Sequence, residues 1–215
     1  MICVSIAEHS VERCLEALDG LDLAEIRMED MSLTSDYIKR IFSQPLKLIA
    51  TCRPGHSPDK RRMQYLVGAI RAGASYVDVE IESDSVWKRE IIKTARRQGC
   101  QVIISFHDHE KTPGLERLKA IISQCFAEGA DIAKIACMVR SEQDNARLLG
   151  LLNRRKHDKK LLVIGMGEKG KITRIVAPFF GSPFSYASLS QGKETAEGQI
   201  TKESLEAITR GVCDA

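Results

Sequence analysis

The sequence predicts a single (β/α)8, or TIM, barrel that occupies residues 1–215. Eight short runs rich in β-branched residues alternate with eight longer stretches of helical periodicity. Strands that alternate with helices pair in parallel through right-handed crossovers. The 215 residues divided among eight units give about 27 residues per unit, which suits closure into a barrel. An open doubly wound sheet is the alternative, but Ala7-Glu8-His9-Ser10 follows the first strand where that fold usually has a glycine-rich phosphate loop.

The expected elements follow one another along the whole chain. The strands cover Ile2–Ile6, Leu23–Met28, Leu46–Cys52, Ser75–Ile81, Gln101–Phe106, Asp131–Ala136, Leu161–Gly165 and Phe184–Ser188. The helices cover Glu8–Asp19, Ser35–Phe42, Asp59–Ala72, Ser85–Gln98, Gly114–Glu128, Ser141–His157, Lys171–Phe180 and Lys202–Arg210. Ser32, Ser83 and Thr201 are expected to cap helix N-termini, because their hydroxyls accept hydrogen bonds from free backbone N–H groups.

Composition and charge exclude several classes of protein. Apolar residues make up 43% and charged residues 28% of the chain, as in ordinary soluble globular proteins. The 32 basic and 29 acidic residues leave a net charge of +3, which argues against a dedicated nucleic-acid binder. No apolar run reaches the roughly 18 residues that a membrane span needs. The seven cysteines include no Cys-x-x-Cys pair, and free thiols in apolar segments indicate a reducing cytoplasm.

Polar side chains near the carboxyl ends of the predicted strands indicate an active site. Barrel strands are covered on both faces and are expected to be apolar, so polar residues on them need an explanation. Lys134 lies in Asp131–Ala136 with apolar neighbours on both sides. Burial disfavours the ammonium form, which favours a nucleophilic amine that forms a Schiff base with a carbonyl substrate. The alternative is a structural ion pair with an acidic residue on a neighbouring strand.

His107 directly follows a predicted apolar strand and is a candidate general acid and base, because an imidazole exchanges protons near neutral pH. A hydrogen-bonded packing role is the alternative. His107 and His109 form a His-x-His pair whose side chains share a strand face, as in some metal sites. No further ligand stands at a diagnostic spacing, so no metal is predicted.

Other charged residues occupy the ends of three more strands. Glu25 and Arg27 are two residues apart and therefore share one strand face. Arg53 ends the third strand, and Asp78 and Glu80 alternate with valines in the fourth. Arginines at a barrel mouth suit carboxylate or polyol binding through directional donors. Interior ion pairs are the alternative for each residue, but polar groups at the same end of five strands predict one shared site.

Eight segments in fixed order carry a resemblance to a known family. They are Glu25-Ile26-Arg27, Ala50-Thr51-Cys52-Arg53, Tyr76-Val77-Asp78-Val79-Glu80, Ser105-Phe106-His107-Asp108, Asp131-Ile132-Ala133-Lys134-Ile135-Ala136, Met166-Gly167-Glu168-Lys169-Gly170-Lys171-Ile172-Thr173-Arg174, Gly181-Ser182-Pro183-Phe184 and Gly198-Gln199-Ile200. Together they resemble type I 3-dehydroquinate dehydratase. The resemblance implies a (β/α)8 barrel that forms a homodimer. It also implies that the protein needs no metal or organic cofactor. It implies dehydration of 3-dehydroquinate to 3-dehydroshikimate in the shikimate pathway through a covalent imine. The charge balance and the lack of a long apolar run predict no nucleic-acid or membrane partner.

The resemblance also implies a role for each matching residue. Lys134 corresponds to the Schiff-base lysine, His107 to the general acid and base, and Arg174 to the clamp on the substrate carboxylate. Contacts on the hydroxyl and enamine sides of the substrate are implied for Glu25, Arg27 and Arg53. Contacts from the closing loop and from the apolar face of the ring are implied for Thr195, Gln199, Met166 and Tyr186.

The loop after Arg53 departs from the family pattern. Many members carry a glutamate in a glycine-rich loop at this point, and it accompanies the catalytic histidine. Here the loop offers His56, Ser57 and Asp59 instead. The group that orients His107 must therefore be found elsewhere or among these three.

The fourth strand offers two carboxylates for this purpose. Asp78 and Glu80 share a face with Tyr76, and the opposite valine face is expected to pack against the helices, so the carboxylates should point into the barrel. We expect Glu80 to orient His107, directly or through Arg53, with Asp78 as the second candidate. The alternative is that both carboxylates only neutralise the neighbouring lysine and arginines.

Three other functions remain open from the residues alone. A class I aldolase shares the barrel and the Schiff-base lysine, but Arg174 and the Gly198-Gln199-Ile200 segment favour a free carboxylate over a phosphorylated sugar. A non-catalytic barrel gives no reason for a lysine on an apolar strand. A metal hydrolase would have to use His107 and His109.

Overall fold

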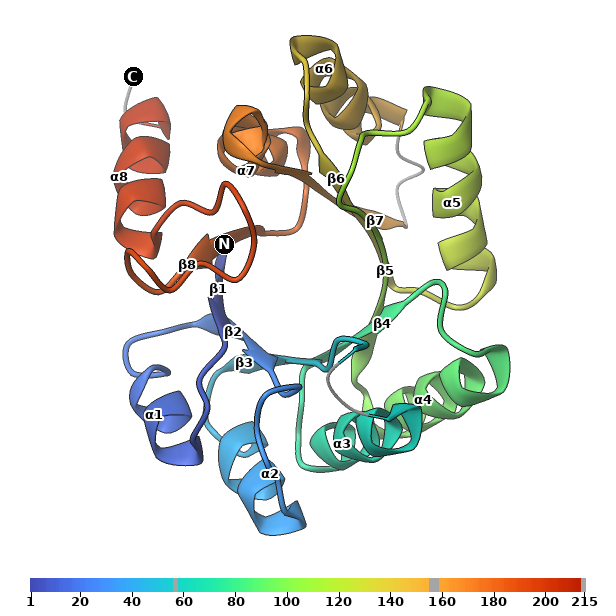
Figure 1. Cartoon of the computed structure of the whole chain (residues 1–215), viewed down its shortest axis with the longest axis vertical. Helices are drawn as coiled ribbons and strands as arrows, with labels where there is room; N and C mark the ends of the chain where they lie inside the picture. The colour runs from blue at the N-terminus through green and yellow to red at the C-terminus, as the bar shows by residue number, and fades with distance from the viewer. Residues whose placement is uncertain (56–57, 155–158, 214–215) are drawn as a thin grey trace.

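Eight parallel strands curve around one axis, and the helices that connect them cover the outer face (Figure 1). The coordinates are a computed structural model and describe residues 1–55, 58–154 and 159–213. The strands are β1 Ile2–Ile6, β2 Leu23–Arg27, β3 Lys47–Thr51, β4 Tyr76–Glu80, β5 Gln101–Asp108, β6 Ile132–Met138, β7 Lys160–Met166 and β8 Ser185–Ser188. Each predicted strand is present within two residues at either end. The predicted TIM barrel is therefore confirmed.

Closure of the barrel is incomplete at one seam. The hydrogen-bonded strand order is β7-β6-β5-β4-β3-β2-β1-β8, so among the described residues β7 and β8 are not paired. The N–H of Gly165 on β7 donates instead to the hydroxyl of Thr173, at 2.7 Å. The next residue, Arg174, donates from Nη1 to the carbonyl oxygen of Tyr186 on β8, at 3.4 Å. Helix α7, Lys171–Val176, thus contacts the backbone of both β7 and β8 at the seam where the two strands do not pair.

Most of the predicted helices are confirmed. The first is three residues shorter at each end than predicted, the last extends three residues further, and two others change more. The helices are α1 Val11–Glu16, α2 Ser35–Phe42, α3 Asp59–Arg71, α4 Ser85–Gln98, α5 Leu115–Ala127, α6 Glu142–Gly150, α7 Lys171–Val176 and α8 Lys202–Cys213, with 3-10 turns η1 Leu152–Arg154, η2 Glu168–Gly170 and η3 Ala177–Phe180. The expected helix over 171–180 is split, because Pro178 has no N–H to continue the α-helical ladder. The expected helix over 141–157 ends at Gly150, and residues 155–158 lie outside the described residues.

Two of the three predicted caps were placed too early. Thr34, not Ser32, caps α2 by accepting from the N–H of Tyr37 at 3.2 Å. Asp84, not Ser83, caps α4, since one carboxylate oxygen accepts from the N–H groups of both Val86 and Trp87. The prediction for Thr201 is confirmed by its contact with the N–H of Ser204, at 3.2 Å.

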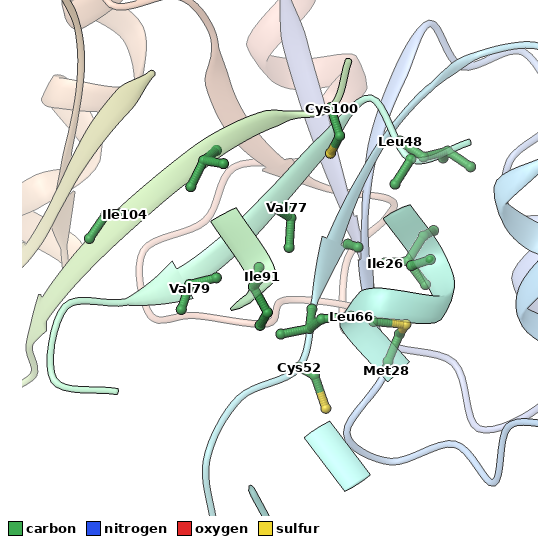
Figure 2. Packing of buried hydrophobic residues seen from close by; sticks show 14 of the residues in the cluster. Ile26, Met28, Leu48, Cys52, Leu66, Val77, Val79, Ile91, Cys100 and Ile104 are labelled. Atoms are coloured by element: carbon green, nitrogen blue, oxygen red, sulfur yellow. The ribbon is translucent and has the colours of Figure 1, made fainter. Parts of the chain in front are cut away.

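The larger apolar core lies between the strands and the helices. Figure 2 shows part of it, where Leu66 of α3 and Ile91 of α4 pack near Val77 and Val79 of β4. The valine face of β4 therefore points outward, as predicted, and its carboxylate face points into the barrel. No helix in the described parts of the chain is long and apolar enough to cross a membrane.

The interior of the barrel changes from apolar to polar along the strands. Inward side chains at the strand starts form an apolar floor: Cys3, Leu23, Ile49, Ile103 and Ile132. Two residues further along the same strands the buried inward side chains are polar: Ser5, Glu25, Thr51, Ser105 and Lys134. Because residues two apart share a strand face, these side chains form a polar ring directly above the floor.

Candidate active site

A cavity of about 590 Å³ opens above the polar ring at the carboxyl ends of the strands. It is lined by every site residue predicted from the sequence except Asp78, which lies beneath its surface. The lining also includes residues that the sequence did not single out for the site, among them Ser5 and Arg62. Arg62 had a detectable signal, because it stands three and four residues before the buried Tyr65 and Leu66 and so belongs to the inner face of α3.

Lys134 is buried in the polar ring and is paired. Its Nζ lies 2.8 Å from Oδ2 of Asp78 and 3.7 Å from Oε1 of Glu25. The same nitrogen lies 3.4 Å from the hydroxyl of Tyr186 and 4.5 Å from the centre of its ring. The alternative interpretation of an ion pair with a strand neighbour is thus present in the geometry. The same nitrogen also lines the cavity, so the geometry leaves both roles of Lys134 open.

Asp78 and Glu25 are the two fixed anions beneath the cavity. Burial opposes ionisation of Asp78, but Arg53 and Lys134 outweigh it and hold the pKa of this carboxyl well below its usual range. Asp78 also accepts from the hydroxyl of Ser105 at 2.6 Å. Burial likewise opposes ionisation of Glu25, and Lys134 followed by Arg53 lowers its pKa nevertheless.

Arg27 lies at the rim and is directed by a neighbouring carboxylate. Its guanidinium contacts Oε1 of Glu29, and Oε2 of Glu29 accepts from the backbone N–H of Arg53 at 3.2 Å. Glu29 is buried and therefore connects the ends of β2 and β3. This pair keeps one guanidinium at the cavity wall.

His107 lies in the cavity wall as a neutral imidazole. Burial, followed by the charges of Arg53 and Lys134, holds the pKa of His107 well below its ordinary value. A neutral ring at pH 7 has a free lone pair and can accept a proton. The ring stacks near that of His109, with 6.2 Å between ring centres and 12° between planes.

No direct hydrogen bond joins Glu80 to His107 among the described residues, and the indirect role of Glu80 through Arg53, which it contacts, stays a prediction. In the described structure Glu80 is occupied by two arginines, with Oε1 at 2.7 Å from Nη1 of Arg53 and Oε2 at 2.8 Å from Nη2 of Arg62. The physical reason is that α3 brings a second guanidinium against the strand end. Of the loop alternatives, Asp59 pairs with Arg62 at 2.6 Å, while His56 and Ser57 lie outside the described residues.

Arg174 differs from the other buried cations of the site. Its side chain is 2% exposed, and no carboxylate in the described structure lies within salt-bridge distance. Its Nη1 and Nη2 reach the carbonyl oxygens of Tyr186 and Glu197 at 3.4 Å each, and its buried Nε has no hydrogen-bond partner. Burial lowers the pKa of Arg174 to about 10, so the guanidinium remains charged at neutral pH. A buried charge without a counter-ion, facing a cavity, is a site for an anion.

The loop between β8 and α8 closes one side of the cavity. Gln199 donates to the hydroxyl of Ser5 at 3.4 Å, and its Oε1 accepts from the N–H of Thr195 at 2.7 Å. The loop approaches β7 so closely that a Cβ on Gly198 would lie 2.2 Å from the carbonyl oxygen of Gly167. Glycine at 198, with φ +74°, therefore permits the loop to sit against the end of β7 beside Met166.

The described residues contain no group of three or more His, Cys, Asp and Glu side chains arranged to hold a metal ion. The cations that surround the cavity instead suit an organic anion. Within one cavity lie an amine, a neutral imidazole and an unpaired guanidinium. This set can bind a carboxylate, attack a carbonyl and move a proton.

Comparison with known proteins agrees with this chemistry. The family model described as type I 3-dehydroquinase matches residues 2–211. The chain belongs to the type I 3-dehydroquinase family. It is 34% identical to the 3-dehydroquinate dehydratase of Methanocaldococcus jannaschii, over 98% of each chain, and 32% identical to that of Methanosarcina barkeri, over 94% of this chain and 90% of the relative. The family predicted from the sequence is thereby confirmed.

Solved structures of the same family share the fold. The 3-dehydroquinate dehydratase of Aquifex aeolicus superposes with a TM-score of 0.82 at 28% identity, over 98% of each chain. The type I enzyme of Clostridium difficile gives a TM-score of 0.87 at 23% identity, over 99% of this chain and 92% of that one. The 3-hexulose-6-phosphate synthase of Salmonella typhimurium is a more distant barrel, with a TM-score of 0.63 at 15% identity.

Proposed function

We propose that this protein dehydrates 3-dehydroquinate to 3-dehydroshikimate, a step of the shikimate pathway, through an imine on Lys134. The observation that carries the proposal is the unpaired, buried guanidinium of Arg174, which shares one cavity with a buried lysine and a neutral histidine. The substrate presents a carboxylate, a ketone and an acidic α-proton, one for each of these groups. Membership of the family and the names of its relatives support the same activity.

The first half of the reaction forms the imine. The neutral His107 accepts one proton from the Lys134 ammonium, and the freed amine attacks the ketone carbon. His107 returns that proton to the ketone oxygen, which takes a second proton from the nitrogen and leaves as water. The protonated imine withdraws electrons more strongly than the ketone, so the adjacent C–H becomes acidic. Asp78, at 2.8 Å from Nζ, stays ionised and stabilises the positive charge that the nitrogen then carries.

The second half moves one proton through His107. On the neighbouring strand Ser105 is in register with Lys134, and His107 stands one inward step closer to the mouth. The neutral imidazole takes the α-proton, the C–H electrons form an enamine, and the imidazolium gives the proton to the departing hydroxyl. Water then hydrolyses the conjugated imine and releases Lys134. General acid–base catalysis of this kind contributes about 10²–10⁴-fold in rate.

The remaining wall residues bind the substrate in this proposal. Arg174 binds the carboxylate, because its Nε has no hydrogen-bond partner in the protein and its Nη contacts with carbonyl oxygens are long. Arg27, Arg53 and Glu25 face the hydroxyl side from the strand ends. The apolar ring face is left to Met166, while Thr195 and Gln199 contact the substrate from the closing loop.

The test combines turnover with covalent trapping. Purified protein is mixed with 3-dehydroquinate, and the conjugated product is followed by its ultraviolet absorbance. Borohydride should then attach the reduced ligand to the peptide that contains Lys134. Lys88 is an internal control, since it is equally buried but pairs with Glu128 away from the cavity. Label on the Lys88 peptide, or equal labelling of a Lys134→Ala variant, would remove Lys134 from the mechanism.

We also propose that the protein is a cytoplasmic homodimer that works without a metal or organic cofactor. Six cysteines in the described chain are free and buried, which agrees with a reducing compartment. Half-exposed apolar side chains on the outer elements near the C-terminus, Phe179 on η3 and Val212 on α8, support a partner surface. Sedimentation equilibrium of the parent and of a Phe179→Asp variant tests this, and a parent that stays monomeric at micromolar concentration would contradict it.

A further inference from the structure

We propose that Arg62 of α3 is a positioning residue for the reaction, which holds Glu80 against Arg53 and so fixes the guanidinium of Arg53 at the cavity wall. The inference rests on the proposed function, because it concerns the same cavity. It concerns a helix residue that does not belong to any barrel strand.

Arg62 is held from four directions. Its side chain is buried, and its Nη2 lies 2.8 Å from Oε2 of Glu80. Its Nε donates to the carbonyl oxygen of Cys52 at 2.9 Å, which ties it to the end of β3. Its Nη1 lies 2.6 Å from Asp59, and its guanidinium stands 5.2 Å from the ring centre of Trp87 on α4. The guanidinium is therefore a fixed point to which strand ends can be attached.

Glu80 connects Arg62 to Arg53 through its two carboxylate oxygens. One carboxylate oxygen of Glu80 accepts from Arg62 and the other from Nη1 of Arg53, at 2.7 Å. Asp78 and Ser105 hold the same guanidinium from below, at 3.0 and 3.3 Å. Glu80 is thus the contact nearest the mouth, and it sets the tilt of Arg53 toward the cavity.

Arg62 also preserves the charge that Arg53 offers to a substrate. Arg53 is surrounded by Asp78, Glu80 and, at 3.7 Å, Glu25. Three carboxylates would cancel the positive potential of Arg53 if none of them also paired with another cation. Asp78 is shared with Lys134, and Glu80 is shared with Arg62. Removal of Arg62 would leave the charge of Glu80 to Arg53, and Oε2 of Glu80 would keep only the long contact with the hydroxyl of Ser83, at 3.5 Å.

The chemistry requires arginine rather than lysine at this position. Three donors reach a carboxylate, a carbonyl and a second carboxylate at the same time, and the guanidinium carbon lies over the ring of Trp87. An ammonium on a flexible stem cannot make these contacts together. Arg62→Lys is therefore expected to behave like Arg62→Met and not like the parent.

The test is a double-mutant cycle with Glu80. Parent, Arg62→Met, Glu80→Gln and the double variant are compared for kcat, KM for 3-dehydroquinate and melting temperature. Arg61→Met is the matched control, because Arg61 is the exposed neighbour on the same helix. We expect each single variant to raise KM about tenfold, with a smaller change in kcat. The KM of the double variant should not exceed that of the more impaired single variant. Borohydride trapping at Lys134 should persist in all of them.

Several outcomes would overturn the inference. A lower melting temperature of Arg62→Met with KM within about twofold of the parent would leave Arg62 a purely stabilising residue. If the two substitutions raised KM multiplicatively in the double variant, Arg62 would not act through Glu80. Should Arg62→Met fail to fold, Arg62→Lys with parental KM would be equally decisive against it. Absence of turnover by the parent would instead overturn the proposed function, and this inference with it.

Discussion

Replacement of Arg174 by methionine should weaken substrate binding and at the same time stabilise the protein in the absence of substrate. The two effects share one cause, which is that the guanidinium is buried without a counter-ion in the described structure. Its carbonyl contacts are long, at 3.4 Å, and its Nε has no partner. Methionine has a similar length and no charge to desolvate.

The size of the effect follows from the pKa. Burial lowers the pKa of Arg174 to about 10, and against about 12.5 for arginine in water this is roughly 3 kcal/mol against the charged form. The folded state binds this proton less tightly than the unfolded state. The cost is therefore fully present below about pH 10 and fades as the pH rises above it. Relief of part of it should raise the free energy of unfolding by about 1–3 kcal/mol, or about 2–10 °C in Tm.

Binding should change in the opposite direction. Loss of a buried guanidinium that faces a carboxylate costs about 2–5 kcal/mol, which is about thirtyfold or more in KM. Thermal melting with and without 3-dehydroshikimate, together with steady-state kinetics, measures both effects. The ligand should raise the Tm of the parent much more than that of Arg174→Met. Arg61→Met, which removes an exposed arginine, should leave both quantities unchanged.

The reasoning would be refuted by an Arg174→Met variant that is destabilised yet keeps the parental KM. That result would mean that the guanidinium is satisfied within the protein. A variant that loses both stability and binding would mean that Arg174 mainly packs the seam between β7 and β8. Only increased stability with weakened binding agrees with an anion site.

Three further predictions follow from the site. Since burial and neighbouring cations hold the pKa of His107 well below its ordinary value, the acidic limb of the kcat/KM profile should lie below pH 6.5, and a midpoint above 7 would contradict a neutral base. Gly198→Ala should raise KM at least about tenfold because its Cβ would meet Gly167; Gly192→Ala, at an equally left-handed φ with nothing within 4 Å, should keep the parental KM. EDTA should leave activity intact, whereas loss of activity restored by zinc would establish a metal site.

The sequence by itself determined the barrel and the direction of most inward side chains. Strand and helix periods are local properties, so alternation along Tyr76, Asp78 and Glu80 was enough to predict which face of β4 points inward. The same local rule placed the inward-facing Lys134 and His107 on adjacent strands, with His107 near the carboxyl end of its strand. Chain order then brought these ends together at one mouth.

Only the tertiary structure decided which of these charges pair with one another. Glu80 meets Arg62, a residue from α3, and this contact depends on how the helix packs against the strand end. Arg174 is left without a counter-ion because α7 occupies the seam where β7 and β8 do not pair. Charge pairing depends on distances of a few ångströms between residues far apart in sequence, and the period of a strand or helix carries no information on such distances.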